Sequence, residues 1–260
     1  MAYALSVNLE YMFHEAGERL EDRIAAAAAA GFTMGEMFTT GERDLPSLAR
    51  ALADNGVTMV SVLADPRTRL IERETHAGFR DLFRKAAEDA LALGCHRVVV
   101  GSGPGVPYMK RAAQLAIVAE AVAGIVPIAE ELGVTAMLEP VNTRVDHPGV
   151  LFSQTIDAVT VIRAVDSPRV RLLYDFYHSL VEGEDPAQQV AEHIGLIEHV
   201  QIADAPGRGQ PGSGTVDWPA MLALLHGAGY RGVIGVECSP TISSTVDALA
   251  YIRGVAAAAG

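Results

Sequence analysis

Four apolar runs in the second half of the chain each end at an oxygen-bearing side chain. These side chains are Glu139, Asp175, Gln201 and Glu237. Two glutamates, an aspartate and a glutamine make a set of hard oxygen ligands, which suits Mg²⁺ or Mn²⁺ better than a zinc site built from cysteine and histidine. Clustered carboxylates repel one another, and a divalent cation relieves that repulsion. The sequence therefore predicts that these four residues hold a divalent metal cation.

Each of these residues also has an ordinary explanation when taken alone. An acid at a strand end is most often a solvated loop residue, because acidic side chains are usually exposed. A glutamine such as Gln201 often only hydrogen-bonds to nearby backbone. Four such side chains in register on successive strands make coincidence a much weaker explanation.

Two basic side chains accompany the oxygen-bearing set. His178 follows Asp175 by three residues in "YDFYHSL", and this offset favours a position facing a pocket over a loop-capping role. Arg208 stands in the glycine- and proline-rich segment "APGRGQPGSG" (205–214). It is either a solvated cation in a turn or a side chain that reaches over the pocket. A guanidinium in that position would bind an anionic or oxygen-rich substrate with bidentate geometry.

Two further polar residues lie on the predicted strands. His199 shares a strand face with Gln201 but lies one layer deeper, so we expect it inside the barrel. Glu36 closes the second predicted strand, where it either faces the pocket or pairs with an arginine.

Strand-like and helix-like patterns alternate along the whole chain. Such alternation indicates a parallel sheet with helical crossovers, and glycines in "AAGF", "DNGV" and "ELGV" mark helix ends. Eight units in about 250 residues match a (β/α)8 TIM barrel; a doubly wound sheet is the alternative. The predicted strands are 3–9, 33–38, 57–63, 96–101, 134–139, 170–175, 197–202 and 232–237. The predicted helices are about 17–30, 45–55, 75–93, 110–132, 153–165, 186–194, 217–227 and 244–257.

The organisation predicts a single domain over residues 1–260, because no linker, low-complexity segment or composition break interrupts the pattern. The longest irregular stretches, about 140–152 and 203–216, follow strands on the side where barrel active sites lie. In a closed barrel the strand ends on that side converge, which would bring the four oxygen-bearing side chains together.

Composition excludes several classes of protein. The chain has a net charge of −12 and no block rich in lysine or arginine, which argues against nucleic-acid binding. Cys95 and Cys238 are far apart, so neither a disulfide framework nor a cysteine zinc site is expected. Acidic residues among the first thirty argue against a signal peptide. No run reaches the roughly 18 uninterrupted apolar residues of a membrane span. We expect a cytoplasmic protein without a membrane partner.

The segments "LEPVNTR", "YDFYH", "HVQIADAPGRGQPGSG" and "GVECSP" resemble the hydroxypyruvate isomerase family. That family belongs to the xylose isomerase-like TIM barrels, together with ketose 3-epimerases. The resemblance covers nearly the whole chain and is strongest from residue 134 onward. "SVNLEYMF" and "AAAGFTMGEMF" near the N-terminus also look like this family.

The resemblance implies roles for individual residues. It implies metal ligation by Glu139, Asp175, Gln201 and Glu237, with Glu139 and Glu237 also acting as the acid/base pair. In related epimerases the residues matching His178 and Arg208 contact substrate oxygens. Epimerases usually carry histidine where Gln201 stands, so the glutamine marks the hydroxypyruvate isomerase branch.

The implied reaction is a metal-dependent aldose–ketose isomerisation of a small hydroxy-keto acid. Hydroxypyruvate to tartronate semialdehyde (2-hydroxy-3-oxopropanoate) is the first pair to test. A divalent metal acts as a Lewis acid that stabilises the enediolate, and positioned carboxylates transfer the proton with an acceleration of about 10²–10⁴-fold. Two glutamates on opposite faces of the substrate permit either isomerisation or epimerisation, and the sequence leaves that choice open.

Two segments depart from the family pattern. After the third strand the family typically has a glycine-rich loop with a Gly-Asp pair, whereas this chain reads "LADPRTRLIERETHAGF". After Glu237 the family often shows an aromatic residue and then a basic or polar one, whereas Cys238 and Ser239 stand here. Both segments border the expected substrate site, so they bear on the identity of the substrate.

Other functions stay in view. A ketose 3-epimerase or a 2-oxo-tetronate isomerase on the same fold is the nearest alternative. A non-catalytic sugar- or acid-binding barrel is disfavoured by the two glutamates. A related barrel family cleaves DNA at abasic sites with three zinc ions, but this chain is acidic and lacks the required histidine cluster. Barrels of this kind often self-associate, and the sequence leaves a homo-oligomer open.

Overall fold

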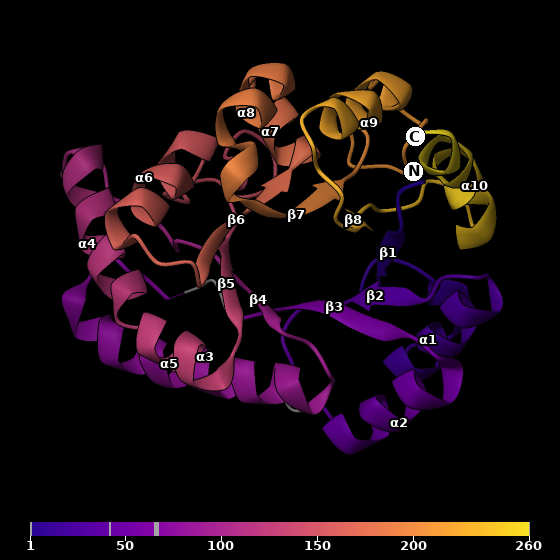
Figure 1. Ribbon diagram of the computed structural model, residues 1–260, viewed down its shortest axis with the longest axis horizontal. Helices are drawn as coiled ribbons and strands as arrows, with labels where there is room; N and C mark the ends of the chain where they lie inside the picture. Colours follow the sequence, from indigo (N-terminus) through magenta and orange to yellow (C-terminus); the bar gives the residue numbers. More distant parts are fainter. Residues whose placement is uncertain (1, 42, 65–67, 260) are drawn as a thin grey trace.

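The computed structural model describes residues 2–41, 43–64 and 68–259. In this part of the chain all strands pair in parallel with their sequence neighbours, and the last pairs with the first to close a barrel. Helices surround the barrel (Figure 1), which confirms the predicted (β/α)8 TIM barrel. The strands are β1 (Leu5–Asn8), β2 (Met34–Glu36), β3 (Thr58–Leu63), β4 (Arg97–Val100), β5 (Thr135–Leu138), β6 (Val170–Asp175), β7 (Ile197–Ile202) and β8 (Ile234–Val236).

Each predicted helix has a counterpart in the structure, with bounds that shift by a few residues. The α-helices are α1 (Leu20–Ala29), α2 (Leu45–Asn55), α3 (His76–Ala92), α4 (Arg111–Ala123), α5 (Val126–Leu132), α6 (Thr155–Val165), α7 (Phe176–Glu182), α8 (Pro186–His193), α9 (Trp218–Gly227) and α10 (Thr245–Ala258). Short 3-10 helices are η1 (His14–Ala16), η2 (Arg73–Thr75) and η3 (Ile194–Leu196).

The helix predicted over about 110–132 is interrupted. It consists of α4 and α5, and Pro127 stands in the first turn of α5. Proline lacks an N–H group, and its ring would clash with the carbonyl of Ala123 in a continuous helix. By length and composition the segment Arg111–Leu132 is apolar enough to cross a membrane, but half of its most apolar window is buried in the protein. A core helix of a globular domain passes the same test.

The helix α7 was not predicted and begins directly after β6. The side chain of Asp175 accepts hydrogen bonds from the backbone N–H groups of Tyr177 (2.7 Å) and His178 (3.3 Å), so it caps the helix. Gly183, with φ 85°, ends the helix in the left-handed conformation. His178 therefore lies on the first turn of a helix, in a segment where the sequence pattern predicts no helix.

The two faces of the barrel wall carry different residues. Outward-facing side chains such as Val98, Leu138 and Leu172 pack with the helices in one large core. The interior is apolar on one side and polar on the other. Val99, Met137 and Leu173 form a small separate apolar cluster, and the buried polar residues Ser6, Glu36, Ser61 and His199 come from strands on the opposite side.

The barrel is closed by contacts between distant parts of the sequence. Residues 5–7 of β1 align with residues 234–236 of β8, and the N–H of Tyr3 donates to the carbonyl of Ala256 at 3.0 Å. In the divergent loop after β3, residues 65–67 lie outside the part of the chain that the structure describes.

Candidate active site

The four oxygen-bearing residues all lie at the C-terminal end of the barrel. Glu139 directly follows β5, and its backbone N–H continues the ladder to Val100. Asp175 is the last residue of β6 and aligns with Gln201 of β7. Glu237 directly follows β8. The structure thus brings these residues to one end of the barrel, as the strand pattern predicts, while their chemical roles remain predictions.

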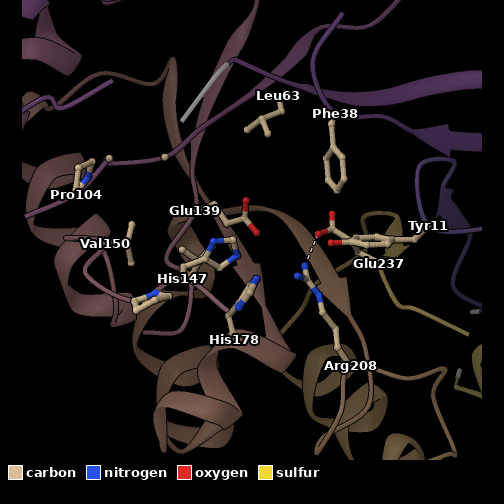
Figure 2. A pocket seen from close by; sticks show the side chains of 14 residues that line it. Tyr11, Phe38, Leu63, Pro104, Glu139, His147, Val150, His178, Arg208 and Glu237 are labelled. Atoms are coloured by element: carbon tan, nitrogen blue, oxygen red, sulfur yellow. Dashed lines mark hydrogen bonds and ion pairs between the residues drawn. The ribbon is translucent and has the colours of Figure 1, made fainter. Parts of the chain in front are cut away.

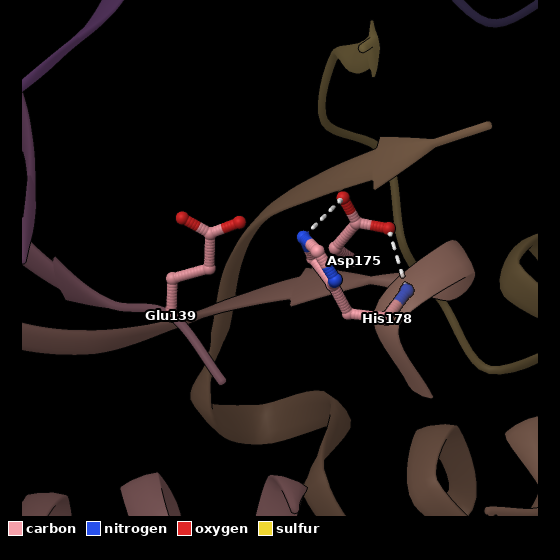
Figure 3. A group of neighbouring side chains, drawn as sticks. All are labelled: Glu139, Asp175 and His178. Atoms are coloured by element: carbon pink, nitrogen blue, oxygen red, sulfur yellow. Dashed lines mark hydrogen bonds and ion pairs between the residues drawn. The ribbon is translucent and has the colours of Figure 1, made fainter. Parts of the chain in front are cut away.

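A group of possible ligand atoms lies at the centre of this end. One ligand atom each from Glu139, Asp175 and His178 can be chosen so that all three lie within 4.8 Å of one another (Figure 3). Gln201 donates from Nε2 to Glu237 Oε2 at 2.8 Å, which links the remaining two residues of the predicted ligand set.

These residues fit a divalent cation. Asp175 Oδ2 and Gln201 Oε1 are buried oxygens with no hydrogen-bond partner in the described structure. A buried oxygen without a partner costs free energy, so such atoms usually have a ligand or a donor nearby. Together with the Glu139 and Glu237 carboxylates they form the oxygen donor set that Mg²⁺ and Mn²⁺ prefer.

The pKa values of the clustered carboxyl groups also favour a bound cation. Desolvation, aided by repulsion from Glu237 and Asp175, raises the pKa of Glu139 well above its usual value. Desolvation raises the pKa of Glu237 to about 7, against the opposing effect of the Arg208 guanidinium. Burial likewise raises the pKa of Asp175. Three carboxyl groups that resist ionisation side by side form a site that a cation or protons must neutralise.

Arg208 lies over the site and contacts one of the predicted catalytic glutamates. Its guanidinium donates to Glu237 Oε1 at 2.5 Å (Figure 2). It lies 5.2 Å from the ring centroid of Tyr11 and 5.4 Å from that of Tyr177, close enough for cation–π attraction. Its backbone carbonyl accepts from the N–H of Ser239 at 2.8 Å. Of the two alternatives that the sequence leaves open for Arg208, the structure shows the side chain that reaches the pocket, and Arg208 also orients Glu237.

The hydrogen bonds of His178 determine which ring nitrogen carries the proton. Nδ1 accepts from the backbone N–H of Asn142 at 3.2 Å. Because a backbone N–H can only donate, the neutral ring carries its proton on Nε2, which lies 4.0 Å from Asp175 Oδ2. Burial, together with the charge of Arg208, lowers the pKa of His178 well below its usual value. The ring is therefore a neutral donor, which suits a substrate oxygen better than a metal ion.

A pocket opens above these residues and has a volume of about 540 Å³. Glu139, His178, Arg208 and Glu237 face it from one side (Figure 2). Its remaining lining is largely apolar, with His147 as the exception. The lining residues that the sequence analysis did not identify include Tyr11, Phe38, Leu63, Pro104, His147 and Val150. Leu63 ends β3 and the others lie in loops after several different strands, so no local pattern marks them.

The structure confirms the prediction made for His199 but not the one made for Glu36. His199 is buried inside the barrel, as predicted, and its Nε2 lies 2.9 Å from Glu36 Oε1. For Glu36, neither sequence-based expectation is correct, because it does not line this pocket and does not pair with an arginine. It is buried and accepts hydrogen bonds from Ser6, Ser61, His199 and Gln201.

The loop that carries Arg208 is anchored by a residue that the sequence analysis missed. Asp204, fully buried, accepts from the N–H groups of Ala205 (2.9 Å), Gly212 (2.6 Å) and Val216 (3.2 Å) and from Trp218 Nε1 (3.2 Å). Each carboxylate oxygen accepts two of these bonds. An aspartate two residues after β7 could have been identified as an anchor only with knowledge of how the loop folds back.

We predict that Asp204→Asn lowers the free energy of unfolding by about 2–3 kcal/mol. Each carboxylate oxygen of Asp204 accepts two N–H bonds, so the NH₂ group of asparagine would face two N–H donors in either orientation of the amide. Urea denaturation measures this loss. Asp217→Asn is the matched control: Asp217 caps α9, and asparagine caps a helix equally well. An equal loss in both variants would contradict the anchoring role.

Comparisons with known proteins agree with the fold and place the chain among isomerases. A family model described as xylose isomerase-like TIM barrel matches residues 24–255. A human protein provisionally named a hydroxypyruvate isomerase is 30% identical over 262 residues, which cover 95% of this chain and 93% of that protein. The 2-oxo-tetronate isomerase of Cupriavidus necator is 32% identical over 244 residues, or 90% of this chain and 92% of that enzyme.

Among solved structures, one titled AP endonuclease, family 2, from Brucella melitensis has a TM-score of 0.89 and 29% identity, covering 98% of this chain and 99% of that one. Its title names a nuclease, whereas the curated relatives above are named isomerases. In this chain, the grouping of possible metal ligands found among the described residues has two carboxylates and one histidine. The presence of a single histidine there, where the nuclease chemistry needs a histidine cluster, and the net charge of −12 favour the chemistry of the isomerases.

Proposed function

The chain belongs to the xylose isomerase-like TIM barrel family, in the hydroxypyruvate isomerase group, and from this premise we propose that it is a metal-dependent isomerase of a small hydroxy-keto acid. The reaction we propose first is the conversion of hydroxypyruvate to tartronate semialdehyde. The observation that carries the proposal is the pair of buried, unpartnered oxygens on Asp175 and Gln201, which lie beside two glutamates whose pKa values are raised.

The metal would be held by Glu139, Asp175, Gln201 and Glu237. When bound, it would act as a Lewis acid on the carbonyl and the adjacent hydroxyl of the substrate. Oxygen ligands of this kind favour Mg²⁺ or Mn²⁺.

Glu139 is placed to carry the proton between carbons. Its side chain lines the pocket, and no other described residue forms a hydrogen bond with its carboxylate. It would take the proton from the hydroxymethyl carbon of hydroxypyruvate and return it to the neighbouring keto carbon.

Glu237 is held more firmly than Glu139. It accepts hydrogen bonds from Asn8 (3.0 Å), Gln201 (2.8 Å) and Arg208 (2.5 Å). Such fixation suits the second member of an acid/base pair, whose position relative to the substrate must not vary. The proton on the substrate hydroxyl would move to the former keto oxygen on this side of the pocket.

Two donors are available to hold the substrate. The Nε2–H of His178 would donate to a substrate oxygen near Asp175. Arg208 Nε is a buried donor without a partner in the described structure, and it would bind the substrate carboxylate. Arg208 is also the one arginine or lysine among the described residues that line the pocket.

The size of the pocket favours one further candidate substrate. A volume of about 540 Å³ is much larger than a three-carbon acid requires, since pockets of roughly 300–1,000 Å³ hold drug-sized ligands. A four-carbon 2-oxo-tetronate, the substrate class named for the Cupriavidus necator relative, would fill more of this space. It would extend from the carboxylates toward Pro104 and Val150.

A coupled isomerase assay on chelator-stripped protein tests the proposal. We expect no turnover without metal and restored turnover with Mg²⁺ or Mn²⁺, with hydroxypyruvate and 2-oxo-tetronates compared in parallel with C4–C6 keto sugars. Turnover of 2-oxo-tetronates alone would move the assignment to the second candidate. Turnover that persists after complete metal removal, or its absence with every substrate, would contradict the proposed function.

A further inference from the structure

A buried polar cluster lies directly beneath the predicted metal ligands. At its centre is Glu36 of β2, a carboxylate that is only 1% exposed. Its Oε1 accepts from Ser6 Oγ and lies 2.9 Å from His199 Nε2, and its Oε2 accepts from Ser61 Oγ at 3.0 Å and from Gln201 Nε2 at 2.8 Å. All of these partners project into the barrel interior. None of the reactions described above uses Glu36.

The contact with Gln201 decides which end of the amide faces the metal site. Gln201 Nε2 donates to Glu36 Oε2 and to Glu237 Oε2, both at 2.8 Å. Ionised carboxylates only accept hydrogen bonds, so both contacts require the NH₂ end of the amide. The carbonyl Oε1 is left on the other side, buried and without a partner. A primary amide has no preference of its own for this orientation over its flip.

Glu36 is itself fixed firmly enough to impose that orientation. Its other three partners hold both carboxylate oxygens, and strand β8 leaves room for it. A Cβ added at Gly235 of β8 would lie 2.1 Å from Glu36 Oε1 and 2.9 Å from His199 Nε2. A glycine at this point is therefore required for the carboxylate to reach Gln201.

We propose that Glu36 is a positioning residue that turns the oxygen of Gln201 toward the cation. The inference depends on the metal dependence in the proposed function and adds a residue that acts through a ligand rather than as one. Partners behind a metal ligand fix its orientation and its donor strength. Glu36 would do for a glutamine what such partners commonly do for histidine ligands.

The test is the affinity of metal-stripped protein for Mn²⁺, measured by titration calorimetry. In Glu36→Gln, the new amide can offer an NH₂ group to Gln201, so only Glu237 still holds the NH₂ end of Gln201 in place. The flipped orientation, which presents the NH₂ group to the metal, then becomes populated. We expect the Kd for Mn²⁺ to rise by about 10–100-fold, the usual effect of losing a partner of a ligand. Ser61→Ala is the matched control, because it removes a bond to the same Glu36 oxygen without touching Gln201, and we expect a much smaller change.

A double-mutant cycle distinguishes an effect of Glu36 on the orientation of Gln201 from a non-specific disruption of the metal site. In a Gln201→Ala background there is no amide to orient, so Glu36→Gln should cause no further loss of Mn²⁺ affinity. Losses that add in the double variant, or an unchanged Kd in Glu36→Gln, would overturn the inference. If Glu36→Gln does not fold, Glu36→Asp replaces it in the same cycle, since the shorter side chain withdraws from Gln201.

The calorimetric titration tests the role of Glu36 and the isomerase assay tests the proposed function, so a negative result in one does not imply a negative result in the other. Because calorimetry reads metal affinity, it decides the role of Glu36 whether or not any keto acid is turned over. Mn²⁺ binding without turnover would count against the proposed function alone. A wild-type protein that does not bind Mn²⁺ would overturn both.

Discussion

Glu139→Gln abolishes most of the isomerase activity, with an expected fall in kcat of about 10²–10⁴-fold at saturating metal, the usual contribution of a positioned acid or base. Glutamine keeps the shape of the side chain and one oxygen that can face a metal, but it cannot accept a proton from carbon. Glu237→Gln should cause a loss of similar size, and it also removes the ion pair with Arg208. Steady-state kinetics over a range of Mn²⁺ concentrations measures both losses.

The matched control is Glu198→Gln. Glu198 lies on β7 like Gln201, but it forms an ion pair with Arg97 at 2.9 Å and is partly exposed. We expect its kcat to stay close to that of the wild type. If high metal concentrations restored full activity to Glu139→Gln, its role would be metal binding alone, and the assignment of Glu139 as the proton carrier would be wrong.

Gly235→Ala should destabilise the protein by about 3 kcal/mol or more, at the upper end of the usual cost of overpacking a core. The added methyl group would overlap Glu36 Oε1 at 2.1 Å. A long side chain at the surface would simply move aside, but here each carboxylate oxygen has two hydrogen-bonding partners. Relief of the clash therefore breaks bonds to buried polar groups, which adds to the steric cost. Chemical denaturation of metal-stripped protein measures the loss.

Gly227→Ala serves as the control for that substitution. Gly227 is the last residue of α9, and a Cβ at this position meets nothing within 4 Å. Alanine favours a helix over glycine by roughly 0.5–1 kcal/mol, so this variant should be as stable as the wild type or slightly more stable. A Gly235→Ala variant with wild-type stability would show that the Glu36 cluster is looser than its hydrogen bonds indicate.

The sequence predicted the barrel well because its signals are local and repeated. Apolar runs and helical patterns recur eight times and glycines mark several of the helix ends, so an error in one unit does not change the fold. The placement of Asp175 and Gln201 followed from the same regularity, since parallel strands in a closed barrel bring their C-terminal ends together. That argument required only the position of each residue within its strand.

The remaining features depend on contacts that local patterns do not encode. Asp175 serves as a helix cap as well as a predicted ligand, so the segment after it folds into α7 where a loop was expected. The orientation of Gln201 depends on Glu36, which is 165 residues away in sequence. The proton position on His178 depends on the backbone of Asn142 in another loop. Each of these required the three-dimensional arrangement.

The closure of the barrel by β1 and β8 has a consequence for the order of folding. Asn8 and Glu237, whose side chains are hydrogen-bonded, are separated by 229 positions. A nascent chain therefore displays an unpaired β1 edge until the last strand has left the ribosome, and such edges readily pair with other chains. Closing so long a loop is also entropically slow. The site can therefore be assembled only after β8 and Glu237 have been synthesised.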